Sequence, residues 1–271
     1  MPELPEVETI RQGLERTIRG QRILRVQVKR RDLRWPVPQG LAARIRGARI
    51  TALRRRGKYL LVDLDSARTM LVHLGMSGRL VQDGPARTHD HVIFHLDSGA
   101  VLRFHDPRRF GMIDLVPTNR LESHDLLKNM GPEPFDPALT SARFHAMAKG
   151  RSTSLKAFLL DQSRVAGIGN IYACEALFRA RLHPALSAGQ MTPTQSRHLL
   201  QAVRAVLTEA IQSGGSSLRD YVQSDGSLGY FQHGFAVYDR KDRPCPVCAT
   251  PIARLTQSAR STFFCTKCQA A

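Results

Sequence analysis

Four of the five cysteines form two Cys-x2-Cys pairs near the C-terminus, and they restrict the fold of that end more than any other feature. The pairs are Cys245 with Cys248 and Cys265 with Cys268, and 16 residues separate them. This spacing is typical of a zinc ribbon, in which four thiolates surround one zinc ion as a tetrahedron. Because four protein ligands leave no open coordination position, the sequence predicts a structural zinc ion in residues 235–271. Redox-active or iron–sulfur cysteines are the alternative.

The charge of the chain indicates a polyanionic partner. Its 271 residues include 40 Lys and Arg against 23 Asp and Glu, a net charge of +17, and the pI is about 10.6. Such basic domains most often bind nucleic acids, because phosphate neutralisation releases counterions. A generic basic surface or attraction to a membrane surface is the alternative, although no basic amphipathic helix favours the membrane.

Nothing in the sequence predicts a membrane span or a secretory signal. It contains no run of about 18 apolar residues, and its acidic start lacks the basic-then-apolar order of a signal peptide. The remaining cysteine, Cys174, lies in an apolar run and is interpreted as a small buried hydrophobe. We therefore expect a soluble, intracellular protein in a reducing compartment.

The first 131 residues have the pattern of a helix followed by a β domain. Apolar residues recur at helical spacing from Pro5 to a stop at Gly20. Short apolar runs separated by turn-forming residues follow, and this pattern predicts a sandwich or barrel. The runs are Ile23–Val28, Tyr59–Leu64, Met70–Leu74, His91–Leu96, Val101–Phe104 and Met112–Val116.

Residues 132–234 have a helical pattern instead. A short helix is predicted from Thr153-Ser154-Leu155, a second over Ile171–Arg179, and a long amphipathic helix from Thr192-Pro193, where proline occupies the first helical position. The glycine- and serine-rich segment 214–230 is expected to be a long mobile loop. Long loops inside compact domains are often functional lids.

The N-terminus offers a reactive group if Met1 is removed, as is usual before a small second residue. Pro2 would then carry a secondary amine, which attacks an aldehyde to form an iminium ion that can absorb electrons. An α-amino group has a pKa of about 7.7–8.0, so roughly a tenth is free base at pH 7. By itself this feature is weak, because most chains that begin Met-Pro do nothing with the proline.

Several longer motifs occur in a fixed order along the chain. They are Met1-Pro2-Glu3-Leu4-Pro5-Glu6-Val7-Glu8, Arg56-Gly57-Lys58-Tyr59-Leu60, His73-Leu74-Gly75-Met76-Ser77-Gly78, Asp106-Pro107-Arg108-Arg109-Phe110-Gly111, Gly167-Ile168-Gly169-Asn170-Ile171-Tyr172 and the cysteine ribbon. Together they resemble the bacterial formamidopyrimidine-DNA glycosylase family over essentially the whole chain. The related endonuclease VIII typically has glycine where Leu4 stands and lacks the Arg-Arg-Phe motif in this form.

The resemblance implies an α+β multidomain protein with DNA in a cleft between its halves. The implied domains are an N-terminal catalytic β-sandwich with a leading helix (1–131), a helix–two-turn–helix DNA-binding domain with a lesion-recognition loop at about 214–230 (132–234), and a zinc-finger β-hairpin (235–271). The implied activity is removal of oxidised purines, chiefly 8-oxoguanine and formamidopyrimidines, from damaged double-stranded DNA, followed by β,δ-elimination. It further implies one structural zinc ion, no catalytic metal, a monomer, no membrane partner and a cytoplasmic, nucleoid-associated location in a bacterium.

The resemblance also assigns residues. Those implied in catalysis are Pro2, Glu3, Lys58 and Arg260. Those implied in DNA binding are His73, Met76, His89, Arg108, Phe110, Arg151 and Asn170. The lesion loop comprises Ser216, Ser217, Leu218, Arg219, Asp220 and Tyr221, and the zinc ligands are Cys245, Cys248, Cys265 and Cys268.

The residues leave alternatives open at several of these positions. Glu3 also fits a first-turn helix charge favoured by the dipole, and Met76 and Phe110 also fit a hydrophobic core. A clamp on the departing phosphate is chemically easier for Arg260 than proton transfer, because arginine stays protonated. At the level of function, an endonuclease VIII-like enzyme for oxidised pyrimidines and a non-catalytic zinc DNA-binding protein are the alternatives.

Overall fold

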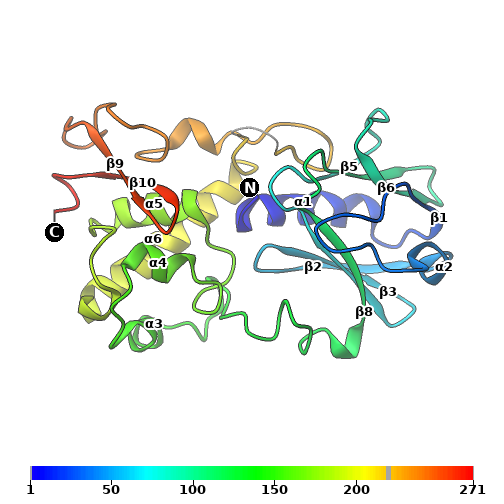
Figure 1. Cartoon of the computed structure of the whole chain (residues 1–271), viewed down its shortest axis with the longest axis horizontal. Helices are drawn as coiled ribbons and strands as arrows, with labels where there is room; N and C mark the ends of the chain where they lie inside the picture. The colour runs from blue at the N-terminus through cyan, green and yellow to red at the C-terminus, as the bar shows by residue number, and fades with distance from the viewer. Residues whose placement is uncertain (1, 218–220, 271) are drawn as a thin grey trace. The chain divides into compact units, whose positions relative to one another are not determined.

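The computed structural model describes residues 2–217 and 221–270 (Figure 1). The chain divides into two compact units. The first comprises Met1–Asn129 and Ile211–Gln232, and the second comprises Met130–Ala210 and His233–Ala271. The glycine- and serine-rich segment after the long helix therefore belongs to the same unit as the N-terminus.

The first helix of the chain, α1, spans Leu4–Ile18 and confirms the predicted helical spacing. Val7, Ile10 and Leu14 lie on one face and are almost completely buried. Pro5 lies in the first turn, where a missing N–H removes no helical hydrogen bond. Figure 1 shows α1 running alongside strand β2 (Ile50–Arg56), against which it packs.

Two four-stranded antiparallel sheets form the body of the first unit. Their orders are β1-β6-β7-β5 and β2-β3-β4-β8. The bounds are β1 Ile23–Val28, β2 Ile50–Arg56, β3 Tyr59–Leu64, β4 Arg68–His73, β5 Arg79–Gln82, β6 Asp90–Leu96, β7 Val101–His105 and β8 Met112–Pro117. Buried apolar residues of both sheets and of α1 form one hydrophobic cluster, so the predicted sandwich with a leading helix is confirmed.

Some elements of the structure were not predicted. Strand β2 ends in Arg54, Arg55 and Arg56, so charge hides its extended conformation, which pairing with β3 stabilises. Strand β5, helix α2 (Leu41–Ile45) and helix α3 (Ser141–Ala148) were missed because each is short. Segments of this length carry too few apolar positions to reveal a period.

The second unit is helical apart from one hairpin. Helix α4 (Leu155–Leu160) begins after Ser154, whose hydroxyl accepts a hydrogen bond from the Ala157 N–H at 3.2 Å. The two longer helices begin where the sequence predicts them. They are α5 (Asn170–Arg179) and α6 (Pro193–Gln212), and α6 continues into the segment assigned to the first unit.

Five short elements complete the described chain. Strands β9 (Ile252–Gln257) and β10 (Arg260–Cys265) form an antiparallel hairpin. Single 3-10 turns are η1 (Thr118–Arg120), η2 (Ala188–Gln190) and η3 (Phe231–Gly234). Within residues 2–217 and 221–270, no helix has both the length and the apolar character needed to cross a membrane.

Candidate functional site

The N-terminal residues lie at the start of α1, and Pro2 and Glu3 are both buried in the full chain. The Glu3 N–H donates to one carboxylate oxygen of Glu6 at 2.8 Å. The other Glu6 oxygen accepts the Ser216 N–H at 2.9 Å. Glu6 thus has a structural role at the helix start, and it also holds the Ser216 backbone. In the full chain the Pro2 nitrogen is bonded to Met1, so a free amine there requires removal of Met1.

The segment expected to form the lesion loop is held at several points within the first unit. The buried Tyr221 hydroxyl donates to the Gly214 carbonyl at 3.1 Å, and the Ser217 hydroxyl donates to the Tyr221 carbonyl at 2.9 Å. The Ser224 carbonyl accepts the Gln82 N–H at the end of β5 at 2.8 Å. Of the predicted loop residues, Ser216, Ser217 and Tyr221 are described, whereas Leu218, Arg219 and Asp220 lie outside the described residues.

Lys58 occupies the two-residue turn of the β2–β3 hairpin and is only 8% exposed. The guanidinium of Arg55 fixes this turn against α1, because it donates to the Glu8 carboxylate and to the Gly57 carbonyl, each at 3.0 Å. Burial raises the pKa of Glu8, but hydrogen bonding and charge from Arg11, followed by the charge of Arg55, lower it below its usual value overall. Glu8 and Arg55 are therefore structural supports of the lysine.

The two histidines assigned to DNA contact lie in different surroundings within the first unit. His73, at the end of β4, accepts the Gly75 N–H at Nδ1 (3.0 Å), which places the proton of the neutral ring on Nε2. Burial, reinforced by the charges of Lys58 and Arg34, lowers the pKa of His73 to about 4. His73 is therefore a neutral donor at pH 7.

His89 lies instead beside two other imidazoles. Its ring contacts those of His91 and His105 at centroid distances of 6.2 and 5.9 Å. His105 shares a hydrogen bond of 3.0 Å with the buried carboxylate of Asp90, and the Asp90 carboxylate also accepts the Arg87 N–H at 2.8 Å. The Asp90 carboxylate thus links the start of the short segment that carries His89 to His105 of strand β7.

Two adjoining loops carry Met76, Arg108 and Phe110, and a buried aspartate joins the loops. Asp106 accepts the Ser77 hydroxyl and the Gly111 N–H, each at 2.7 Å. The same Ser77 oxygen accepts the Arg108 N–H at 3.3 Å. The motif residues around the exposed side chains therefore fix the relative positions of the two loops.

The glycines of these motifs are required by close approach of the backbone. Gly75 has a φ of +62°, and a Cβ atom there would lie 2.3 Å from the Phe110 carbonyl carbon. Met76 and Phe110 are 40% and 41% exposed, so the alternative that they belong to a hydrophobic core is wrong. The Arg108 guanidinium lies over the Phe110 ring, with 4.7 Å between Cζ and the ring centroid.

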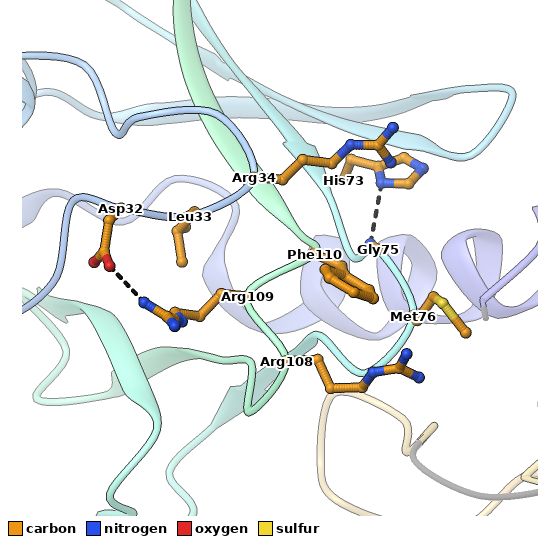
Figure 2. A pocket seen from close by; sticks show the side chains of 9 residues that line it. All are labelled: Asp32, Leu33, Arg34, His73, Gly75, Met76, Arg108, Arg109 and Phe110. Carbon is orange, nitrogen blue, oxygen red and sulfur yellow. Dashed lines mark hydrogen bonds and ion pairs between the residues drawn. The ribbon is translucent and has the colours of Figure 1, made fainter.

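These loops border a cavity of about 600 Å³ (Figure 2). Figure 2 shows Arg34 beside His73, Met76 and Arg108 on the loops with Phe110, and Asp32 turned toward Arg109. The lining residues are Asp32, Leu33, Arg34, His73, Gly75, Met76, Arg108, Arg109 and Phe110. The cavity thus combines apolar and aromatic surface with arginine side chains.

In the second unit, the β9–β10 hairpin is fastened to two helices. The buried Lys156 of α4 donates to the Ser261 carbonyl at 2.9 Å and to the Thr262 hydroxyl at 2.6 Å. Asn170, the first residue of α5, donates from its side-chain amide to the same Ser261 carbonyl at 2.9 Å. Arg260, next to Ser261, is exposed at the start of β10.

Arg151 lies in the turn after α3 and is partly buried. Its Nε donates to the Met147 carbonyl at 2.9 Å, and its own carbonyl accepts the Ser187 hydroxyl and the Gly189 N–H. These contacts fix the backbone of the turn and the root of the arginine side chain.

The four paired cysteines form the candidate metal centre. Their sulfur atoms all lie within 4.8 Å of one another, and three of the separations are 3.4, 3.5 and 3.9 Å. A tetrahedron with zinc–sulfur bonds of about 2.3 Å has sulfur–sulfur edges of about 3.8 Å. The cluster therefore fits one structural zinc ion, held by Cys245, Cys248, Cys265 and Cys268.

Several supporting residues were missed at the level of sequence. Lys156 and Glu175 each interrupt an apolar helical run, which is the pattern that would have revealed them. The Glu175 carboxylate accepts the N–H groups of residues 236–238 at 2.8–3.0 Å, and so fixes the segment that leads to the hairpin. Cys174 packs in the hydrophobic cluster around the hairpin, in agreement with its interpretation as a buried hydrophobe.

Comparison with known proteins identifies the chain. The formamidopyrimidine-DNA glycosylase N-terminal domain matches residues 1–113, the formamidopyrimidine-DNA glycosylase H2TH domain matches 130–222, and the zinc finger found in FPG and IleRS matches 243–271. A formamidopyrimidine-DNA glycosylase of Ruegeria pomeroyi is 50% identical over 282 residues, which cover 99% of this chain and 100% of the relative. The chain belongs to the formamidopyrimidine-DNA glycosylase family.

Other members of the family agree over the full length. The formamidopyrimidine-DNA glycosylase of Acidiphilium cryptum is 50% identical over 274 residues, covering 99% of this chain and 100% of the relative. The crystal structure of the MutM (Fpg) protein of Thermus thermophilus matches with a TM-score of 0.90 and 41% identity, over 99% of this chain and 98% of that one. Lactococcus lactis Fpg bound to DNA containing an abasic site matches with a TM-score of 0.92 and 32% identity, over 99% and 100%.

Membership of the formamidopyrimidine-DNA glycosylase family decides the broad activity. The protein is a DNA glycosylase of base-excision repair with abasic-site lyase activity, and it has the zinc finger of the family. The non-catalytic zinc protein is thereby excluded.

Proposed function

We propose that this glycosylase excises oxidised purines, 8-oxoguanine and formamidopyrimidines, through a Schiff base on Pro2. The Fpg protein of Lactococcus lactis is known in complex with Fapy-dG-containing DNA, as a G226P mutant, and with abasic-site DNA. These complexes support this substrate class. The observation that carries the proposal is the start of the chain. Glu3 is the N-cap of α1 and Pro2 immediately precedes it, so removal of Met1 would leave a secondary amine at the start of this helix.

The chemistry begins when the Pro2 nitrogen bonds to C1′ of the lesion nucleotide and the bond from C1′ to the base breaks. The base departs with the electron pair and takes up a proton, while the attacking nitrogen loses its own proton. The bond from C1′ to the ring oxygen O4′ then breaks, which opens the sugar and leaves an iminium ion between the nitrogen and C1′. Glu3 supplies a proton to the opening sugar or the leaving group. Glu3 is buried, only 3% exposed, next to the Pro2 nitrogen along the chain.

The resulting iminium ion makes the C2′ proton acidic, because the cation can accept the electron pair of that bond. Loss of this proton expels the 3′ phosphate, and a second elimination expels the 5′ phosphate. Lys58, held in its turn by Arg55, serves proton transfer in these steps. Arg260, exposed on the hairpin, clamps the departing phosphate, for which a fixed guanidinium is well suited.

Extrusion of the lesion leaves a hole in the duplex, at a cost of a few kcal/mol. Met76 and Phe110 are proposed to fill the hole as apolar wedges, and Arg108 to contact the partner base. Their exposure on two loops fixed by Asp106 supports this assignment, because a wedge must be both accessible and rigid.

Contacts to the phosphate backbone complete the proposed interface. They are assigned to His73, His89, Arg151 and Asn170. A neutral His73 with its proton on Nε2 is a suitable donor to phosphate, and Asn170 has a second amide hydrogen beyond the one donated to Ser261. Such contacts orient the duplex without reading its sequence.

The remaining assignments concern lesion recognition and the state of the protein in the cell. The loop Ser216–Tyr221 is proposed to contact the extruded base through backbone amides. We further propose that the protein acts as a monomer on damaged double-stranded DNA and is located in the bacterial cytoplasm, at the nucleoid. A duplex of defined sequence together with sedimentation analysis tests the stoichiometry.

Competition between lesions tests the substrate class. Matched duplexes with a single 8-oxoguanine or a single thymine glycol are incubated with the enzyme and borohydride, which reduces the iminium ion to a stable covalent adduct. We expect trapping and excision to favour 8-oxoguanine. Preference for thymine glycol would establish the endonuclease VIII-like alternative, and binding without any trapping would contradict the amine mechanism.

A further inference from the structure

An aspartate stands where a DNA-binding surface is expected to be basic. Of the nine described residues that line the cavity of Figure 2, Asp32 alone is acidic, whereas Arg34, Arg108 and Arg109 are basic. In a chain with a net charge of +17, a carboxylate beside a phosphate-binding surface opposes association. Its position therefore calls for a specific function.

Asp32 is engaged by two arginines. Arg30 donates to both carboxylate oxygens of Asp32 at 2.9 Å in a bidentate pair, and the Arg109 guanidinium contacts the same carboxylate. The hydrogen bond from Arg30, followed by the charges of Arg30 and Arg109, holds the pKa of Asp32 well below its usual range. The carboxylate is thus ionised throughout the range in which the protein binds DNA.

The partner of Asp32 lies inside the loop that carries the proposed wedge. Arg109 stands between Arg108 and Phe110, and its φ of +57° is in the left-handed region that non-glycine residues avoid. Such a backbone persists only where its surroundings enforce it. The enforcing contacts are the Arg109 N–H bond to the Asp106 carbonyl at 3.2 Å and the ion pair to Asp32.

We propose that Asp32 is a specificity-determining positioning residue, which holds Arg109 and with it the turn bearing Arg108 and Phe110. The Asp32 carboxylate draws the guanidinium groups of Arg109 and Arg30 to itself, so their charges do not bind the phosphates of undamaged DNA. Lesion binding, which uses the wedge, is favoured over non-specific binding, which uses charge alone. This inference rests on the proposed function of Arg108 and Phe110.

The expected effect follows from counterion release. Each additional phosphate contact steepens the slope of log K against log salt by about 0.9, which corresponds to about eightfold in affinity between 1 M and 0.1 M salt. Loss of the Asp32 charge would release Arg109 and Arg30. Asp32→Asn should therefore bind undamaged duplex about tenfold or more tightly at 0.1 M salt, with a slope steeper by about 1 to 2.

The experiment measures binding of wild type and Asp32→Asn to a short undamaged duplex and to the same duplex with one reduced abasic site, across a salt series. Asp125→Asn is the matched control, because it removes one exposed carboxylate, paired with Lys128, from the same unit. The ratio of affinity for the abasic-site duplex to affinity for the undamaged duplex should fall in Asp32→Asn and stay at the wild-type value in Asp125→Asn. Equal slopes and ratios in the two variants would overturn the proposal.

A double-mutant cycle with Arg109→Gln tests whether Asp32 acts through its partner. We expect the effect of Asp32→Asn on undamaged affinity to fall by about half or more in the Arg109→Gln background, since only Arg30 is then left to release. An undiminished effect would mean direct repulsion of phosphate and would contradict the positioning role. The proposed function is tested separately, by whether wild type binds the lesion duplex more tightly than the undamaged duplex. Absence of that preference would refute the proposed function. The effect of Asp32→Asn on binding to undamaged duplex can be measured whether or not the preference exists.

Discussion

Substitution of Gly75 by alanine tests whether the loop interlock positions the proposed wedge. Gly75 has a φ of +62°, so any side chain there costs about 1–2 kcal/mol of backbone strain. Its Cβ would also lie 2.3 Å from the Phe110 carbonyl carbon and 2.4 Å from the Phe110 oxygen. Because backbone atoms must move to relieve this overlap, a further penalty of about 1–3 kcal/mol is expected. The total predicted loss of folding free energy is about 2–5 kcal/mol.

Gly99→Ala is the matched control. Gly99 has a φ of +88°, and its Cβ would meet nothing within 4 Å, so this variant carries the backbone strain without the overlap. The fluorescence of Trp35, the only tryptophan, reports urea unfolding of the first unit in both variants. We expect Gly75→Ala to lose more stability than Gly99→Ala and also to bind lesion DNA more weakly. Equal losses in the two variants, with lesion binding unchanged, would refute the interlock.

Other consequences of the structure are open to direct measurement. Lys156→Met should lose about 3 kcal/mol, because the buried Thr262 hydroxyl and the partly buried Ser261 carbonyl lose a charged donor. Urea unfolding compared with that of Lys149→Met, which changes an exposed lysine, checks this. The imidazole of His73 should titrate by NMR with a pKa near 4. The folding free energy that the neutral ring contributes is lost as pH falls from about 6.5 to 4, because only the unfolded state binds the proton in that window. A titration midpoint at pH 6.5 would contradict the burial of His73. Zinc chelation should expose the amides of the β9–β10 hairpin to hydrogen exchange and weaken DNA binding, and both should recover when zinc is restored.

The sequence predicted the parts of the fold whose patterns are long or repeated. The apolar spacing of α1 was sufficient because one buried face repeats along the helix. The runs of β1 and β3 were sufficient because each is a short apolar stretch bounded by turn-forming residues. Strand β2 was missed because Arg54–Arg56 resemble a phosphate-binding stretch. In the structure Arg54 pairs with Asp63 and Arg55 with Glu8, so this charge serves folding.

The candidate metal centre was predictable because zinc coordination requires cysteines at a particular spacing. The catalytic role of Pro2 stays a prediction. The supports of the functional site were not predictable, because they depend on contacts between residues distant in sequence. Asp106 joins the Met76 and Phe110 loops through partners on both of them, and no local pattern distinguishes it from a surface aspartate. The Asp32–Arg109 pair spans 77 residues and is visible only in three dimensions.

Mass-spectrometric mapping of the borohydride-trapped adduct tests the amine mechanism most directly. Protein with Met1 removed is trapped on 8-oxoguanine DNA, digested and sequenced, beside a preparation that retains Met1. Our account predicts the reduced sugar on the nitrogen of Pro2 in the first preparation and no adduct in the second. An adduct on a lysine, or equal trapping with Met1 in place, would contradict it.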